Sequence, residues 1–226
     1  MNYAIILAGG TGKRIGASIP KQFIKINGKP ILVYTLEKFE NHPLVDSITV
    51  VCVEGWESEV RLLSKEFNIS KLSNVVTGGN TALQSIRRGY ESLNPADDDI
   101  IIIHDGVRPL VDEVSISNVI NDCILFGGAI SSVPLIEHVF FVGNERSDLH
   151  YIPRENAFRT VTPQAYSSEK MKRAFIESDK SGKGKDSPFI GIMMMDVGEK
   201  VVLSIGSEKN IKITDPNDIL YFKSLY

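Results

Sequence analysis

The sequence predicts an α/β fold: a Rossmann-like, mostly parallel and twisted sheet with helices on both faces. Two observations support this fold class. Short apolar runs such as residues 47–53 lack polar alternation, which is typical of strands buried on both faces. Each run is followed by a segment with apolar residues at helical spacing, such as residues 57–67. Strands that alternate with helices form parallel sheets, because each helix carries the chain back to the start of the next strand.

The individual elements follow from the same periodicities. We expect strands at residues 3–7, 47–53, 74–77, 99–103, 129–133, 200–205 and 210–214. We expect helices at residues 30–39, 57–67, 81–93, 113–125 and about 167–177, and a last helix that starts at 215–216. Residues 180–186 are polar and glycine-rich, which predicts a mobile loop, and the methionines at 193–195 are interpreted as core side chains.

Residues 134–161 break the alternation of strands and helices. Two extended segments flank a turn at Gly143-Asn144, which indicates a β-hairpin. If this hairpin projects, it exposes residues 139–142 and forms an association surface; the alternative is that these residues fold back onto the core. We therefore expect a single domain over residues 1–226, with 134–161 as a projecting β-hairpin arm for dimerisation.

Composition narrows the functional class. With 226 residues, of which 42% are hydrophobic, the chain can bury the core of one large domain. A net charge of −3 argues against a nucleic-acid partner. No apolar run approaches the roughly 20 residues of a membrane span, and no signal peptide is seen, so we expect a cytoplasmic protein without a membrane partner. Cys52 and Cys123 have no metal or disulfide spacing and are interpreted as core thiols.

The first expected strand runs into a glycine-rich loop. Gly9, Gly10 and Gly12 allow the backbone to turn sharply, so that successive amide groups can point at an anion. Two cations follow, Arg14 and Lys21. Glycine amides with a guanidinium and an ammonium suit a triphosphate better than a single carboxylate.

This loop differs from two well-known phosphate loops. It lacks the Gly-x-x-x-x-Gly-Lys-Ser/Thr spacing of a Walker loop. It also has Ile15 where a dinucleotide fingerprint requires its third glycine. An NAD-dependent dehydrogenase, which would also need an acid about 20 residues further on, is therefore a weak alternative.

Ligands of parallel α/β sheets bind outside the carboxyl ends of the strands. That rule brings together the loops at residues 9–22, 78–85 and 104–109. The second loop can wrap a base, with Ser85 reaching its polar edges, or it can be an ordinary helix start. Asp105 and Arg108 follow a buried strand, where unpaired charges are costly, so a functional role is favoured. His104 is equally typical of a structural donor and of a catalyst.

Six motifs occur in the order of a known family. They are the glycine loop, Pro20-Lys21-Gln22, Gly78-Gly79 with Ser85, His104-Asp105-x-x-Arg108-Pro109, Arg154 followed by Thr162-Pro163-Gln164, and Asn210-Ile211-Lys212-Ile213-Thr214. These motifs are spread over almost the whole chain, and through them the sequence resembles the 2-C-methyl-D-erythritol 4-phosphate and D-ribitol-5-phosphate cytidylyltransferases. The resemblance implies attack by the phosphate of an acceptor on the α-phosphorus of CTP, with release of pyrophosphate, in a homodimer that uses Mg²⁺.

The resemblance also implies roles for individual residues. The catalytic residues are Arg14, Lys21 and Lys212. The nucleotide-binding residues are Leu7, Ala8, Gly9, Gly10, Thr11, Gly12, Gly78, Gly79, Ser85 and Asp105. The acceptor-binding residues are Gly106, Arg108, His138, Arg154 and Thr162, with Arg154 delivered on the arm of the partner subunit. Asp105 is the metal candidate.

The departures from the family pattern concern the acceptor. Ala82 stands where the family usually has arginine, Glu137-His138 replaces Asp-Thr, and residues 188–190 replace an acidic pair. His138 could still bind a phosphate when protonated. Gly-Gly-Thr-Gly and Val-Arg-Pro lean towards the ribitol-phosphate branch. Another sugar or polyol phosphate in surface-glycan synthesis, and a nucleotide-binding homologue with impaired catalysis, remain alternatives.

Overall fold

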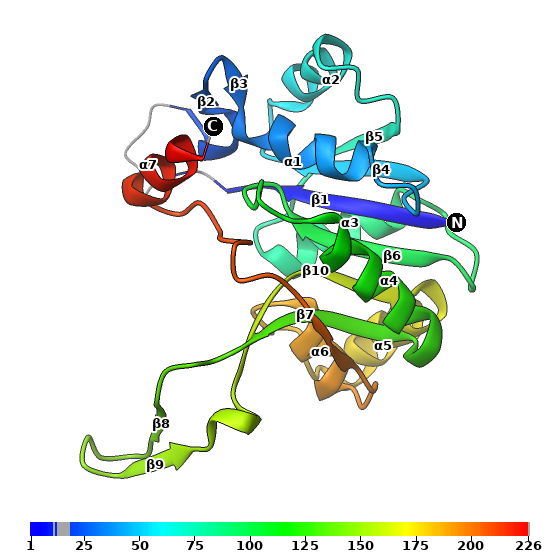
Figure 1. Cartoon of the computed structure of the whole chain (residues 1–226). Coiled ribbons are helices and arrows are strands. Elements are labelled where there is room, and N and C mark those ends of the chain that lie inside the picture. Colours follow the sequence, from blue (N-terminus) through cyan, green and yellow to red (C-terminus); the bar gives the residue numbers. More distant parts are fainter. Residues whose placement is uncertain (11, 13–18, 226) are drawn as a thin grey trace.

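The computed structural model describes every residue of the chain except 11, 13–18 and 226. Within the described residues, seven strands form one sheet in the order β11-β7-β10-β6-β1-β4-β5 (Figure 1). Its strands are β1 (Asn2–Ala8), β4 (Ser47–Cys52), β5 (Leu72–Thr77), β6 (Ile100–Asp105), β7 (Gly128–Pro134), β10 (Phe158–Ser167) and β11 (Val202–Ile205). The neighbouring strands are parallel except at β10, which runs antiparallel to both β6 and β7. The predicted mostly parallel sheet is confirmed.

Helices cover both faces of this sheet, as predicted. They are α1 (Ile31–Glu40), α2 (Glu57–Glu66), α3 (Ala82–Glu91), α4 (Glu113–Phe126), α5 (Ser168–Ser181), α6 (Ile190–Asp196) and α7 (Pro216–Ser224). Alternate residues of a strand face opposite layers. Ile6 of β1 packs in a cluster with side chains of α1, α2 and α4, whereas Ile5 packs with those of α3, α5 and α6. The apolar runs lack polar alternation because both faces are covered.

The helix ends are set by local side chains and glycines. Thr81 accepts a hydrogen bond from the backbone N–H of Gln84 at the start of α3, and Asp112 caps α4 in the same way. The two longest helices end at Gly127 and Gly182, whose φ angles are +76° and +75°. Glycine adopts this left-handed conformation without steric cost, so the chain can leave the helix there.

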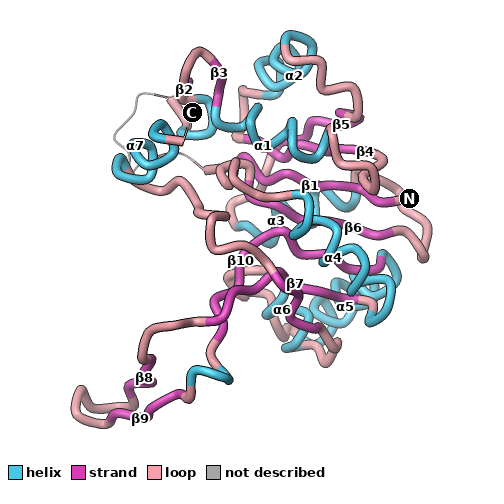
Figure 2. The backbone as a smooth tube through the Cα atoms, in the orientation of Figure 1, coloured by secondary structure: helices cyan, strands magenta, loops and turns pink. Residues whose placement is uncertain are grey.

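The arm projects from the sheet as a hairpin of β8 (Val139–Val142) and β9 (Leu149–Ile152), followed by the 3₁₀ turn η2 (Arg154–Asn156). Figures 1 and 2 show it extending away from the layered body. Phe140 and Phe141 are 52% and 61% exposed, so they are not folded back onto the core. The connection between the strands spans residues 143–148 and is wider than the expected turn at 143–144.

Other expectations need correction. The expected strand at residues 210–214 does not form: Asn210 bonds to the carbonyl of Thr162 on β10 through its side chain, and Ile213 N donates to Val107 in a turn, so the backbone of the segment does not pair with a strand. The strand β10 was not expected, although it lies between two strands of the sheet. α5 continues to Ser181 and takes in the start of the expected loop at 180–186.

Several core predictions can be checked directly. Met193 and Met194 are fully buried on α6, whereas Met195 is 52% exposed, so the core interpretation is right for two of the three methionines. Cys52 and Cys123 are both buried, as expected, and burial raises the pKa of their thiols to about 11 and about 12. Among the described residues, no helix has the length and apolar character needed to cross a membrane.

Candidate active site

Two adjoining hollows open in the described part of the molecule at the carboxyl ends of β1 and β6. We call the first the glycine hollow, since Gly9, Gly10 and Gly79 line it together with Lys21. The second, the Thr162 hollow, is lined by Thr162 and by further side chains of β6, β10 and α6. Both hollows share Leu7, Ala82, Asp105 and Lys212, and therefore form one continuous cleft. Its position is the one expected for ligands of a parallel sheet.

Lys21 lies close against the glycine loop. It belongs to the short 3₁₀ helix η1 (Lys21–Phe23) and is 8% exposed. Its ammonium donates a hydrogen bond of 2.7 Å to the carbonyl oxygen of Ile213. A Cβ at Gly10 would lie 3.4 Å from Lys21 Cε, and one at Gly12, whose φ is +73°, would lie 3.0 Å from Lys21 N. A side chain at Gly12 would therefore be strained and would press on the backbone of the lysine, whereas a Cβ at Gly10 would only touch the lysine side chain.

The second glycine pair is shaped by Ser85. Its hydroxyl accepts a hydrogen bond from Gly79 N and donates one to the carbonyl of Thr81, both at 3.0 Å. A Cβ at Gly79 would lie 2.5 Å from Gln84 Cβ, and one at Gly78 would lie 3.0 Å from Ser85 Oγ. Both positions therefore require glycine, and Ser85 holds the loop while it also lines the glycine hollow.

Asp105 joins two cations at the centre of the cleft. Arg108 Nε lies 2.8 Å from its Oδ2, and Lys212 Nζ lies 3.1 Å from its Oδ1. Arg108 also donates to the carbonyl of Asn210 at 2.9 Å. Burial alone would raise the pKa of Asp105, but the charges of Lys212 and Arg108 outweigh it and lower the pKa below the ordinary 3.8. The carboxylate therefore stays ionised and holds two like charges beside each other.

Thr162 and Asn210 fix the backbone around this carboxylate. Asp105 N donates to Thr162 Oγ1 at 3.1 Å, and Asn210 Nδ2 donates to the carbonyl of Thr162 at 2.6 Å. Asn210 is fully buried, and the sequence analysis missed its role. The position of Asn210 at the start of the Asn-Ile-Lys-Ile-Thr motif was the available indication of this role. A buried side-chain amide needs hydrogen-bond partners, and here its partner is the carbonyl of Thr162.

His104 is a structural residue. Its side chain is fully buried on β6, and its Nε2 lies 3.2 Å from the carbonyl oxygen of Arg108, to which the neutral ring can donate. Burial lowers its pKa to about 4. At neutral pH the ring is therefore uncharged and closes the turn from Asp105 to Arg108. The question that the sequence left open is answered in favour of the structural role.

Some expected site residues do not line the cleft. Gly106 packs into the core, where a Cβ would lie 2.9 Å from Leu32 Cδ1 and 3.1 Å from the carbonyl oxygen of Leu7. Ala8 is buried and accepts a hydrogen bond from the side chain of Gln22. These residues shape the site from behind. Thr11 and Arg14 lie outside the described residues.

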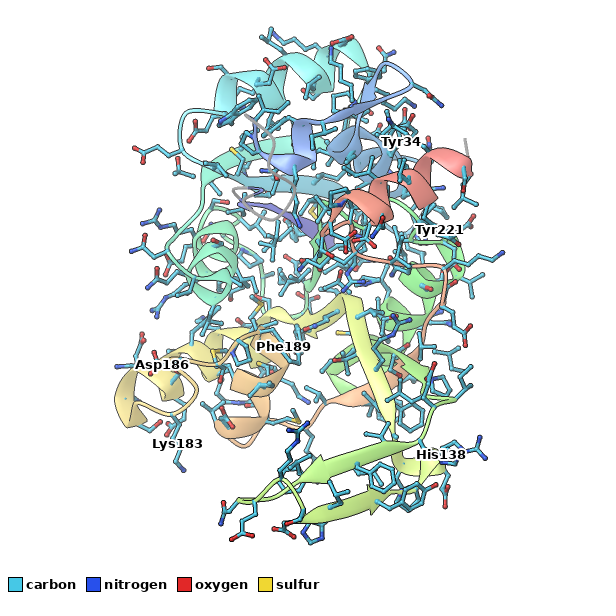
Figure 3. The ribbon with its side chains drawn as sticks, turned by 90° about the vertical axis from the view of Figure 1, so that its left-hand side faces the viewer. Tyr34, His138, Lys183, Asp186, Phe189 and Tyr221 are labelled. Atoms are coloured by element: carbon cyan, nitrogen blue, oxygen red, sulfur yellow. The ribbon has the colours of Figure 1, made fainter. Side chains whose placement is uncertain are left out.

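His138 and Arg154 lie on the arm. Both are exposed, and neither lines the glycine hollow or the Thr162 hollow of its own chain. Arg154 Nη1 lies 3.3 Å from the carbonyl oxygen of Ile136. Figure 3 shows His138 on the arm and Phe189 in the body of the molecule. The arm residues of one chain therefore stand apart from the cleft of that chain.

Two of the three departures from the family pattern lie in the Thr162 hollow, whereas Glu137 and His138 do not line it. Ala82 lines it at the start of α3, and Pro188, Phe189 and Ile190 line it near the start of α6. These side chains are apolar, whereas Thr160, Thr162 and Gln164 supply polar groups from β10. One part of this hollow thus suits hydroxyl groups and another suits C–H groups.

Replacing Asp105 by asparagine tests the charge arrangement. Because the folded-state pKa lies below 3.8, the ionised carboxylate contributes stability that is present above that pH and is lost as the pH falls through the lowered pKa. We expect Asp105→Asn to lower Tm by about 2–4 °C at neutral pH. The difference from the wild type should shrink at about pH 3. Thermal unfolding across this range measures it, and an equal gap at both ends would contradict the assignment.

Comparisons with known proteins identify the family of the chain. The family profile described as 2-C-methyl-D-erythritol 4-phosphate cytidylyltransferase matches residues 2–225. A ribitol-5-phosphate cytidylyltransferase of Lacticaseibacillus paracasei is 42% identical over 98% of this chain and 96% of its own length. A 2-C-methyl-D-erythritol 4-phosphate cytidylyltransferase of Clostridium acetobutylicum is 36% identical over 100% of this chain and 97% of its own length.

A solved structure shows the same fold. The 4-diphosphocytidyl-2C-methyl-D-erythritol synthase of Anaerococcus prevotii superimposes with a TM-score of 0.84, covers 100% of this chain and 97% of its own, and is 23% identical. The family profile and the two sequence relatives confirm the family assigned by the motifs, and the dehydrogenase alternative falls away. Because the family profile spans nearly every residue, the chain belongs to the 2-C-methyl-D-erythritol 4-phosphate cytidylyltransferase family and is a nucleotidyltransferase.

Proposed function

We propose that the chain transfers CMP from CTP to ribitol 5-phosphate and releases pyrophosphate. The observation that carries this proposal is the cleft in which Asp105, Arg108 and Lys212 join a glycine hollow to a second hollow. Such a cleft can hold a triphosphate on one side of a cationic centre and an acceptor on the other. The 42% identity to a ribitol-5-phosphate enzyme favours ribitol 5-phosphate as the acceptor. The second candidate, 2-C-methyl-D-erythritol 4-phosphate, is supported by the family profile.

The reaction needs no general base from the protein. A phosphate oxygen of the acceptor is already ionised near neutral pH and can attack the α-phosphorus directly. His104 fits this scheme, because a buried ring with a pKa of about 4 is a weak base near neutral pH and lines neither hollow. Catalysis then depends on positioning the two phosphates and on stabilising the charge that develops between them.

The cations of the cleft divide this work. Lys21 and the glycine loop face the triphosphate, and Arg14 is assigned beside them by its place in the motif. Lys212 lies where the two hollows meet, and Arg108 lies in the Thr162 hollow, on the acceptor side. Asp105 holds these two cations together, which would otherwise repel each other. Thr162 is placed to contact the acceptor from β10.

Mg²⁺ is proposed as the metal of the reaction. In the described residues, no three side chains of His, Cys, Asp or Glu gather as a metal site. A single carboxylate still fits Mg²⁺, because this ion usually binds through one or two carboxylates together with substrate phosphates. Asp105 is the carboxylate that lines both hollows, and its Oδ1 would be shared with Lys212. When bound, the ion neutralises charge on the phosphate oxygens.

We further propose that the enzyme is a cytoplasmic homodimer joined through the arm. The exposed Phe140, Phe141 and Tyr151 support this, because apolar side chains on a projecting hairpin suit burial against a partner. In such a dimer, Arg154 and His138 reach the cleft of the partner subunit, where they bind the acceptor phosphate. This arrangement accounts for their distance from the cleft of their own chain.

An acceptor panel tests the proposed reaction. Pyrophosphate release is measured with CTP and Mg²⁺ against ribitol 5-phosphate, 2-C-methyl-D-erythritol 4-phosphate, glycerol 3-phosphate and several sugar phosphates. We expect kcat/KM for ribitol 5-phosphate to exceed that for the methyl-branched acceptor by about 10- to 100-fold. The two acceptors differ by a methyl branch and a hydroxyl-bearing carbon, and one such small group typically changes kcat/KM by this factor.

A Lys21→Ala variant serves as the control in the panel and should lose the signal. A higher kcat/KM with the methyl-branched acceptor would assign that branch instead. Turnover only with a sugar phosphate would indicate a different glycan precursor. Silence with every acceptor, while CTP still binds, would contradict the transferase and favour an impaired homologue.

A further inference from the structure

A small hydrophobic cluster beside the cleft joins the segments that carry the site cations. We call it the C-terminal cluster; its buried members are Ile26, Ile31, Tyr34, Val107, Ile213 and Phe222. It is separate from the two larger clusters on the faces of the sheet. In Figure 1, α7, which carries Phe222, lies beside the small hairpin of β2 (Lys25–Ile26) and β3 (Lys29–Pro30), which carries Ile26.

Three members of this cluster lie close in the sequence to charged residues of the site. Ile26 follows η1, which holds Lys21. Val107 lies in the turn between Asp105 and Arg108. Ile213 follows Lys212 directly. A movement within the cluster would therefore move cations of the cleft relative to one another.

Phe222 is the buried side chain through which α7 enters this cluster, and the partly buried Ile219 of the same helix packs against the cluster. Phe222 is fully buried and is the buried residue of α7. Its ring meets Tyr34 edge to face, with ring centroids 5.1 Å apart. Tyr34 in turn donates a 2.8 Å hydrogen bond to the carbonyl of Ile26. Exposed residues such as Leu220 and Tyr221 flank Phe222 on the same helix.

The docked helix fixes the backbone at Ile213. Asp215 and Asp218 form a capping box at the start of α7, and Asp218 also accepts a 2.7 Å hydrogen bond from Thr214 N. Ile213 N donates to the carbonyl of Val107 at 2.9 Å, and Ile213 O accepts from Lys21 Nζ at 2.7 Å. One peptide segment thus connects the helix to both sides of the cleft.

We infer that Phe222 is a positioning residue for the transfer reaction: by docking α7 it sets the positions of Lys21 and Lys212, although it touches no substrate. This inference rests on the proposed function for its kinetic readout. It goes beyond stability, because α7 is connected to the site through Ile213, whose backbone bonds to Lys21 Nζ and to Val107.

The test compares two phenylalanines of similar burial. Phe222→Leu changes the C-terminal cluster, and Phe175→Leu changes the cluster on the α5 face, where Phe175 is 6% exposed and lines neither hollow. Tm, the Kd for CTP and kcat/KM are measured for both. We expect Phe222→Leu to lower kcat/KM by about 10-fold and Phe175→Leu to stay within about twofold, at comparable losses of Tm.

A double-mutant cycle with Lys21→Met separates positioning from stability. If Phe222 acts through the lysines, Phe222→Leu should cost less in the Lys21→Met background than in the wild type, and about twofold or less once Lys21 and Lys212 are both replaced. Additive losses, or equal losses for the two phenylalanine variants, would overturn the inference. The same cycle measured as Kd for CTP decides it even if no acceptor is turned over; absence of turnover by the wild type would count against the proposed function alone.

Discussion

Replacing Lys21 by methionine is expected to lower kcat for pyrophosphate release by about 10²- to 10³-fold. Lys21 is 8% exposed, so its charge acts in a poorly solvated site where it interacts strongly with phosphate. Methionine has a similar length and keeps the apolar stem packed against Gly10. The loss should therefore appear in kcat, because charge that develops during the transfer is no longer neutralised.

Lys25 provides the matched control for this experiment. It lies four positions further along the chain and is exposed, so Lys25→Met removes the same charge from the same region without changing the cleft. We expect kcat of this control to stay within about twofold of the wild type, since surface substitutions have small effects. If Lys21→Met kept more than about a third of the wild-type kcat at an unchanged Tm, the ammonium would not act at the reacting phosphates.

The sheet could be predicted because its strands are buried on both faces. Residues 48–52 and 100–103 consist almost wholly of apolar or β-branched side chains and leave little ambiguity between strand and loop. The strand β10 was not predicted, because its sequence lacks the continuous apolar run of the other strands. It contains Pro163, and Thr160, Thr162 and Gln164 line the Thr162 hollow, so its polar residues serve the cleft. Function at this strand overrides the periodicity on which sequence reasoning depends.

The prediction of a strand at residues 210–214 was wrong for the opposite reason: the sequence pattern is that of a strand, but the backbone is irregular. Its alternation of apolar and polar residues is typical of a strand, yet Asn210 bonds to Thr162 and Ile213 bonds to Val107, so no strand pairs with it. What the alternation reflects is a chain that buries Ile213 in a cluster while exposing Lys212 to the cleft. The pattern correctly predicted that Ile213 is buried and Lys212 is exposed, but it predicted neither the burial of the polar Asn210 nor the irregular backbone.

The sequence could predict which residues belong to the site, but not which of their side chains contact each other. The rule that loops meet at the carboxyl ends of strands brought Asp105 near the glycine loop. The contact of Asp105 with Lys212 joins residues 107 positions apart, and no spacing in the sequence indicates it. The buried positions of Ala8 and Gly106 were equally invisible, because a small residue beside a cleft can line it or support it from behind.

Mixing two defective variants is expected to restore activity, because the arm carries Arg154 away from the cleft of its own chain. Arg154→Ala alone should raise KM for the acceptor by at least about 10-fold, since a bidentate partner of its phosphate is lost. In a heterodimer of Arg154→Ala with Lys21→Met, one cleft receives both defects and the other receives none. Half of the dimers in a fully exchanged equimolar mixture are heterodimers, so about a quarter of the wild-type activity should return.

The matched control mixes Lys21→Met with Lys212→Met. Both lysines line the cleft of one chain, so each cleft of this heterodimer keeps one defect and no activity should return. Light scattering should give twice the chain mass of 25.0 kDa for every variant, which separates loss of assembly from loss of a phosphate contact. If the Arg154 mixture merely averaged the two parent activities while the dimer mass persisted, Arg154 would not serve the partner's cleft. Restored activity in the Arg154 mixture alone requires a cleft completed by the partner's arm, because no single chain in that mixture carries both intact residues.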